Sequence, residues 1–247
     1  MAKQSGLGDN FYLHGYDVSG DISSVNVSGG PAALTTTGID KSAFERIGGL
    51  RTGAMTGTCY FNPGTDRAHP RLSGLPRTDV IASYFRGTTL GNPAACQVSK
   101  QINYDGQRGD DGAFTFSFDL QCNGFGVEWG RSLTAGVRTD TAATNGSSID
   151  TTASASFGAQ AYLQAFAFTG TDVTVKIQDS ADNSTFADVT GLSFTQLTAG
   201  RTAERIATAN NATIRRYIRA VTVTTGGFSS LAFSVVIVKN ELAGVVF

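Results

Sequence analysis

The chain has 247 residues, a formal net charge of −1 and only 16% charged residues, against about 25% in a typical globular protein. Its 40% hydrophobic content excludes an intrinsically disordered chain, and its charge shows no basic excess of the kind found in nucleic-acid-binding domains. No apolar run approaches about eighteen residues and the start lacks the apolar core of a signal peptide. We therefore expect no transmembrane helix, and a protein made and kept in a cytoplasm.

The first predicted helix covers residues 40–47. Asp40 can act as its N-cap, Phe44 and Ile47 have helical spacing, and Gly48 and Gly49 follow as helix breakers. Residues 53–61 are predicted to form a strand, and residues 66–74 a second short helix.

A hairpin is predicted in the middle of the chain. Phe114, Phe116, Phe118, Leu120 and Cys122 alternate with polar residues, which is typical of a half-buried antiparallel strand. Residues 96–104 also alternate, and the sequence DGQRGDDG joins the two segments as a turn. Just upstream, residues 80–85 fit a strand, or a short helix capped by Thr78 and Asp79.

Between about Leu133 and Phe157 the composition changes, and large apolar residues are rare. We interpret residues 137–157 as a linker or long loop between an N-terminal domain, residues 1–136, and a C-terminal β-sandwich of immunoglobulin-like or jelly-roll-like type, residues 158–247. If so, a chain ending before Ser148 should still fold and assemble. The six predicted C-terminal strands cover residues 159–168, 173–178, 186–189, 204–207, 217–224 and 231–238.

The sequence KIQDSADNSTFADV, residues 176–189, resembles a cation-binding loop because it contains Asp179, Asp182, Asn183 and Asp188. A calcium loop of the EF-hand kind also needs a Gly at its bend and a final bidentate Glu, and both are missing. Apolar alternation on either side of this stretch instead indicates a hairpin with a polar turn.

No catalytic or cofactor motif is found. The three cysteines, Cys59, Cys96 and Cys122, are far apart and form no Cys-x-x-Cys pair, so we expect buried free thiols. The two histidines, His14 and His69, are too few for a multi-histidine metal centre. Asp110 and Asp111 fit a solvated hairpin turn. We predict no catalytic residues, no metal, no cofactor and no enzymatic activity.

Three segments in order resemble the major tail proteins, or tail tube proteins, of long non-contractile-tailed phages (siphophages) that infect actinobacteria. They are GLGDNFYLHGYDVSGDISSVNVSGGPAAL, GIDKSAFERIGGLRTGAMTGTCYFNP and DGAFTFSFDLQCNGFGVEWGRSLTAG, and they span roughly residues 1–136. The resemblance rests on the order and character of segments, because this family has no short catalytic signature.

The resemblance implies a mainly β structural protein of the virion tail, assembled in the host cytoplasm. Its N-terminal domain would be a tail-tube-type β-sandwich or barrel with a short helix. Copies would form homohexameric rings that stack into a hollow tube and contact other phage tail proteins. DNA would pass through the lumen without specific binding, and the protein would make no membrane contact of its own. In this family a long loop and the termini join adjacent rings.

The Gly-rich, low-charge segment of residues 28–57 is the predicted subunit or ring contact, with the character of a loop that orders on assembly. Its apolar side chains are too widely spaced to form a core of their own, yet burial of each is worth about 1.5–3 kcal/mol. The predicted contact residues are Leu34, Ile39, Phe44, Ile47, Leu50 and Met55.

Two other functions fit the same composition. A capsid decoration protein or a minor tail protein would also be β-rich and non-catalytic. A carbohydrate-binding module would fit the C-terminal sandwich, but sugar platforms usually need exposed aromatic rings. The single Trp, Trp129, lies in the N-terminal half of the sequence, which counts against that function.

Overall fold

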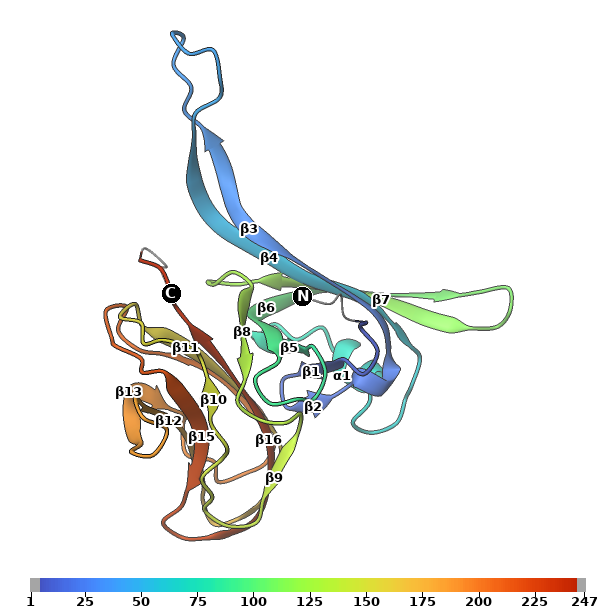
Figure 1. The fold of residues 1–247 in the computed structure, drawn as a ribbon. Coiled ribbons are helices and arrows are strands. Elements are labelled where there is room, and N and C mark those ends of the chain that lie inside the picture. Colours follow the sequence, from blue (N-terminus) through green and yellow to red (C-terminus); the bar gives the residue numbers. More distant parts are fainter. Residues whose placement is uncertain (1–4, 244–247) are drawn as a thin grey trace.

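The computed structural model describes residues 5–243 and is mainly β, as the sequence predicts. A curled sheet with a short helix forms the N-terminal half, and a β-sandwich forms the C-terminal half (Figure 1). The N-terminal elements are β1 (Asn10–Leu13), β2 (Tyr16–Asp17), the 3-10 helix η1 (Ser19–Asp21), β3 (Ile22–Thr35), β4 (Arg46–Tyr60), α1 (Ala68–Leu72), β5 (Val80–Phe85), β6 (Pro93–Arg108), β7 (Phe114–Cys122) and β8 (Glu128–Ser132).

The N-terminal sheet runs in the order β2-β1-β5-β6-β7-β4-β3, and each neighbouring pair is antiparallel. Its inner face packs around α1, with Phe11, Met55, Leu72, Phe118 and Leu120 completely or almost completely buried. Alternation explains this arrangement, because every second residue of β7 faces the same core. Phe114, at the outer end of the predicted apolar face, remains partly exposed.

Two glycines of this sheet lie opposite phenylalanines of β7. Gly57 on β4 pairs with Phe118, and Gly106 on β6 pairs with Phe116. A Cβ atom on Gly106 would lie 2.5 Å from a ring atom of Phe116, and one on Gly57 would lie 2.7 Å from Phe118. The rings therefore use the space that any other residue's side chain would fill.

The predicted helix at residues 40–47 is wrong. Residues 36–45 form the turn of a long hairpin, and β4 already begins at Arg46. A short helix there would have no surface to pack on, whereas the strand gains a full ladder of hydrogen bonds with β3. The expectation that residues 28–57 have the character of a loop that orders on assembly is also wrong, because most of that segment forms the strands β3 and β4.

The other N-terminal predictions are confirmed in position. The predicted strand at residues 53–61 coincides with the second half of β4 except for its last residue, and α1 lies within residues 66–74. Residues 80–85 form the strand β5 and not the alternative helix. The predicted hairpin is β6 and β7, with Asp110 and Asp111 exposed at its turn.

All six predicted C-terminal strands are present, and two short strands precede them. The elements are β9 (Arg138–Asp140), β10 (Ile149–Asp150), β11 (Ala159–Gly170), β12 (Thr174–Ser180), β13 (Ala187–Ser193), β14 (Thr202–Ala207), β15 (Tyr217–Val223) and β16 (Phe228–Lys239). One layer contains β14, β11 and β16, and the other has the order β10-β15-β12-β13. Val175, Ile177, Leu163 and Phe233 lie in the core between them.

Residues 137–157, predicted as a linker or long loop, run along the sandwich. Their strands β9 and β10 pair with β16 and β15. Arg138 donates two hydrogen bonds to Asp140, at 2.7 and 2.6 Å, and a third to the carbonyl oxygen of Ala220. This segment is therefore tied to the C-terminal half by backbone and side-chain contacts.

The two halves share a third core. Tyr12, Ile81 and Phe85 from the N-terminal sheet pack against Tyr162, Phe166 and Val236 from β11 and β16. The strand β8 also joins the halves, because it pairs with β6 on one edge and with β16 on the other. The domain boundaries at residues 136 and 158 remain predictions. However, the shared core argues against independent folding of a chain that ends before Ser148, since β11 and β16 would be missing.

A buried ion pair crosses between the halves. Arg205 on β14 donates from Nε and Nη2 to the two carboxylate oxygens of Glu128 on β8, each at 2.9 Å, and both side chains are less than a tenth exposed. The hydroxyl of Tyr162 also donates to Glu128, and the Arg205 guanidinium lies 3.7 Å from the ring centroid of Phe125. Removal of one partner would leave the other charged and buried.

We expect Glu128→Ala to lower the free energy of unfolding by about 3–5 kcal/mol, because Arg205 would lose its bidentate partner inside the protein. Arg216→Ala, which breaks the exposed ion pair with Asp150, is the matched control and should change stability little. Urea denaturation followed by circular dichroism measures both. Equal effects of the two substitutions would contradict the role given to the buried pair.

Candidate assembly surface

The outer part of the β3–β4 hairpin projects from the body, and we call residues 29–53 the arm (Figure 1). β3 pairs only with β4, and β7 pairs with β4 only from Ala54 to Tyr60. Beyond Gly53, which is buried beside Val127 and Cys122, the hairpin is thus a two-stranded ribbon with solvent on both faces. Within residues 28–52 every residue is exposed except Thr37 and Gly49, which are half-buried.

Five of the six predicted contact residues lie exposed on the arm, with exposed fractions between 49% and 110%. They are Leu34, Ile39, Phe44, Ile47 and Leu50. Leu34 and Ile47 are direct cross-strand partners, so their side chains share one face. The sixth, Met55, is completely buried in the N-terminal core and lies outside this surface. None of residues 5–243 covers the other five.

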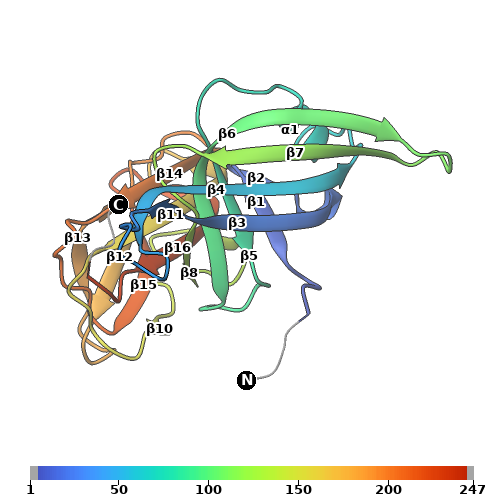
Figure 2. The same cartoon turned by 90° about the horizontal axis from the view of Figure 1, so that it is seen from above.

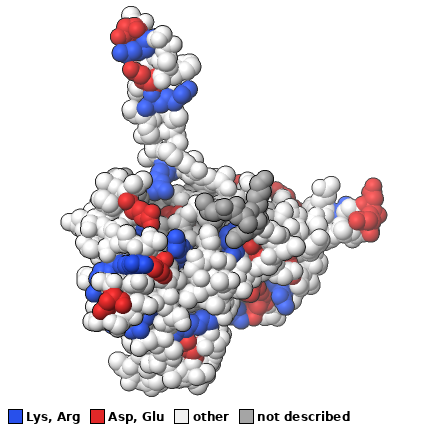
Figure 3. Space-filling view, viewed as in Figure 1, with Lys and Arg blue, Asp and Glu red and all other residues white. Residues whose placement is uncertain are grey.

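The tip of the arm is ordered by its own hydrogen bonds. The backbone N–H of Thr36 donates to the carbonyl oxygen of Glu45 at 2.9 Å, and the N–H of Glu45 donates to the Thr37 hydroxyl at 2.9 Å. Lys41 lies 3.5 Å from Asp40 and 3.7 Å from Glu45, and Arg46 lies over the Phe44 ring. The tip therefore carries both basic and acidic side chains, as Figure 3 shows, next to the exposed side chains of Ile39 and Phe44.

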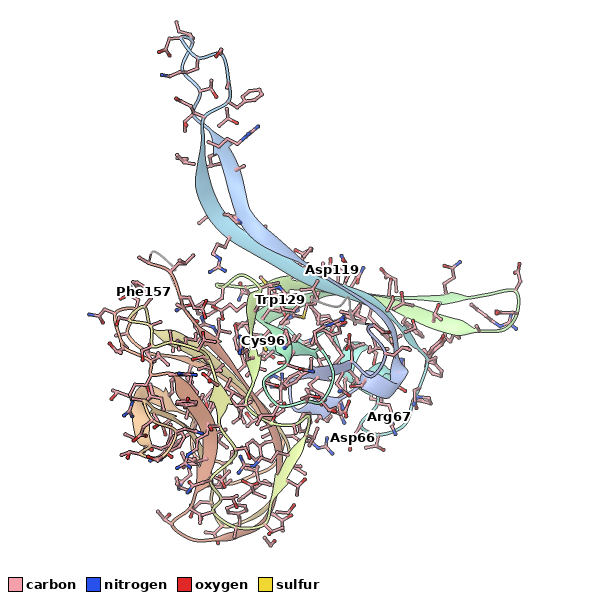
Figure 4. The ribbon with its side chains drawn as sticks, in the orientation of Figure 1. Asp66, Arg67, Cys96, Asp119, Trp129 and Phe157 are labelled. Carbon is pink, nitrogen blue, oxygen red and sulfur yellow. The ribbon has the colours of Figure 1, made fainter. Side chains whose placement is uncertain are left out.

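The four strands β3, β4, β7 and β6 lie side by side when viewed from above (Figure 2). Their solvent face, opposite to the core around α1, carries small polar side chains, carboxylates and, at the end of β4, the exposed ring of Tyr60, and we call it the polar face. It includes Ser24, Asn26, Thr56, Thr58, Asn103, Asp105, Ser117 and Asp119. Asp119 is labelled in Figure 4. Residues 22–28, 54–60, 101–107 and 115–121 contain two Asp and no Lys or Arg.

Within residues 5–243, this four-stranded unit has two free edges. One is β3, which has no second partner among residues 5–243. The other is the distal part of β6, since β5 pairs with β6 only as far as Ser99 while β7 follows it to Arg108. Unpaired edges of this length are templates for pairing with another chain.

The acidic turn at residues 179–188 is the hairpin that the sequence predicts, between β12 and β13. Its carboxylates are occupied by the protein's own donors: Arg215 reaches Asp179 at 2.7 Å, and Lys176 and Gln178 reach Asp188. Backbone N–H groups of Thr185 and Ser184 donate to Asp182 and hold the pKa of its carboxyl far below the usual range. In residues 5–243, no group of three or more His, Cys, Asp or Glu is placed to hold a metal ion.

The thiols and histidines serve packing. Cys59 and Cys96 are buried and Cys122 is half-buried, and burial raises the pKa of Cys96 to about 12 and that of Cys122 to about 11. His69 on α1 lies against Phe61 and 3.3 Å from the Tyr104 hydroxyl. His14 occupies the turn between β1 and β2, where its backbone N–H donates to the carbonyl oxygen of Ile81.

None of the helices within residues 5–243 has the length and apolar character needed to cross a bilayer.

No protein-family model and no curated protein matches the chain. Similar solved structures include a chain in the virion of a native gene transfer agent particle (TM-score 0.41, 11% identity, 51% of this chain and 98% of that one). Another is in the tail of an empty gene transfer agent particle with C6 symmetry (TM-score 0.42, 12% identity, 51% of this chain and 98% of that one). A third is the SPP1 Dit protein, described as a hub adsorption apparatus (TM-score 0.32, 13% identity, 92% of this chain and 98% of that one). Likeness at these TM-scores does not establish a shared fold or function.

We expect Phe44→Asp to change the free energy of unfolding of the unassembled chain by less than about 1 kcal/mol, because its side chain is exposed. Met55→Asp is the matched control, since it places a carboxylate in the core and should unfold the protein. Circular dichroism and urea denaturation of dilute protein measure both. A loss of β-sheet signal in Phe44→Asp would show that this ring belongs to the subunit's own core.

Proposed function

We propose that the protein is a structural subunit that joins copies of itself into rings, and that the rings stack into a hollow tail tube through which DNA passes. The observation that carries this proposal is the four-stranded unit β3-β4-β7-β6, which combines two free edges with an acidic, Lys- and Arg-free polar face. The resemblance of residues 1–136 to siphophage tail tube proteins supports the same function and a hexameric ring in the virion tail.

The strand directions allow the edges to join. Four antiparallel strands alternate in direction, so β3 and β6 at the two ends run in opposite senses. Pairing β3 of one copy with the distal part of β6 of the next would continue the antiparallel order. Because the two edges differ, this contact is heterologous and can be repeated around a closed ring. Ring closure would remove both edges from solvent.

The polar face suits the lining of a DNA conduit. Each phosphate contact with Lys or Arg releases counterions and adds affinity, which would hold DNA inside the tube. Hydroxyls, amides and the carboxylates of Asp105 and Asp119 offer DNA no such contact. A face of this composition would keep the lumen hydrated and let the duplex pass.

The arm suits a contact with a second subunit. Its five exposed apolar side chains remain in water in the isolated chain, and burial of each is worth about 1.5–3 kcal/mol. A neighbouring subunit or an adjacent ring can supply that burial. Symmetry repeats the contact around each ring, so one substitution is multiplied by the number of subunits.

We expect Phe44→Asp to prevent tube formation while the subunit stays folded, because it places a carboxylate in the buried part of the proposed contact. Val223→Asp changes an apolar residue of the C-terminal half that is also exposed, at 37% against 72% for Phe44, and should assemble normally. Sedimentation velocity and negative-stain microscopy measure the result. If Phe44→Asp forms normal tubes, the arm is not part of the contact between subunits.

Disulfide trapping tests the edge pairing. We expect oxidation of Asn26→Cys/Asp105→Cys, or of Asn26→Cys/Gln107→Cys, to link neighbouring copies, because paired strands bring Cα atoms within about 7 Å. A denaturing gel should then show a ladder that ends at the ring size, and the single variants should show none above their native thiols. Assembled rings without a ladder in either pair would contradict edge-to-edge closure.

A further inference from the structure

Trp129, the only Trp of the chain, forms an exposed platform on a rigid strand. Its side chain is 52% exposed although β8 is paired on both edges. Ala95 of β6 lies opposite Trp129, and Ile237 of β16 lies opposite Arg131. The sequence position of Trp129 counted against a sugar site, but the structure places this residue where the two halves meet (Figure 4).

Trp129 lies at a groove of about 330 Å³ between the end of β16 and the loop after β10. Arg131, Thr151, Lys239 and Glu241 also line it. Arg131 donates from Nη1 to the carbonyl oxygen of Asp150 at 3.2 Å, and Lys239 Nζ donates to the Thr151 hydroxyl at 2.8 Å. Lys239 Nζ also donates to the carbonyl oxygen of Ala153. The protein itself thus positions both cations, and Arg131 keeps four N–H donors and Lys239 keeps one.

We propose that this groove binds an acidic saccharide, meaning a pyranose ring that carries a carboxylate or a phosphate. The apolar face of the ring would pack on the indole, and the anionic group would accept charge-assisted hydrogen bonds from Arg131 and Lys239. Glu241 at the rim can accept a hydrogen bond from a sugar hydroxyl. With two cations and one carboxylate, the lining complements a single negative charge.

This site is independent of the proposed tube, because none of its lining residues belongs to the arm or to the polar face. The emission of Trp129 reports on the groove directly, since no other Trp contributes. The experiment is a fluorescence titration of the full-length, unassembled chain with glucuronate, glucose 6-phosphate and glucose, repeated by calorimetry for Trp129→Ala.

We expect saturable emission changes with glucuronate or glucose 6-phosphate, and binding of glucose that is at least about tenfold weaker, as loss of a charged hydrogen bond predicts. The two acidic probes distinguish carboxylate from phosphate recognition. Arg131→Gln should weaken binding by a similar factor, Trp129→Ala should abolish it, and Arg77→Gln, an exposed arginine elsewhere, should leave it unchanged.

Three results would overturn the proposal. One is the absence of saturable binding at millimolar concentrations of both acidic probes. Another is equal affinity for glucose and the acidic sugars, because the cations would then play no part. The third is a change in Trp129 emission on self-association alone, without response to any sugar, which would make the groove a contact between subunits.

Discussion

The pairing of β8 on both of its edges is the constraint on which the rest of the molecule depends. β6 lies on one side and β16 on the other, so the N-terminal sheet and the C-terminal sandwich share a continuous backbone ladder. Glu128 projects from this strand into the shared core and meets Arg205. Trp129, the next residue, projects to the opposite side and borders the groove. One short strand thereby fixes the joint between the halves and the only indole of the chain.

The N-terminal sheet separates its two faces by chemistry. The inner face holds the rings of β7 against α1 and the glycines of neighbouring strands, while the outer face carries hydroxyls, amides and two carboxylates. The arm extends two of the same strands beyond the core, where no inner face is available to bury Leu34, Phe44 or Leu50. These side chains are therefore available to a second molecule, and none of them belongs to a core of the subunit.

The alternation of apolar and polar residues along the sequence predicted the strands that have one face in a core. Phe116, Phe118 and Leu120 identified β7, and the C-terminal strands followed from the same pattern. Alternation of Met55, Gly57 and Cys59 with Thr56 and Thr58 could also have shown that Met55 faces the core and not a partner.

Other features had no local signal. β3 contains Gly29, Gly30 and Pro31, which are poor strand formers, and it is held by pairing with β4. Asp40 and the spacing of Phe44 and Ile47 satisfied the rules for a helix, but the rules contain no information on whether a packing surface exists. Pairing of β8 with β16 joins residues about a hundred positions apart, which no local pattern encodes, so the surroundings of Trp129 required the structure.

The arm leaves the four-stranded unit at one end only, and this gives any ring built from its edges a polarity. In a head-to-tail ring all subunits have the same orientation, so every arm would project from the same rim while the opposite rim would have none. Two such rings could stack only in one sense, with the rim that carries the arms of one ring against the rim without arms of the next. The resulting filament would have two chemically different ends, so growth could be started at one end and stopped at the other by different proteins.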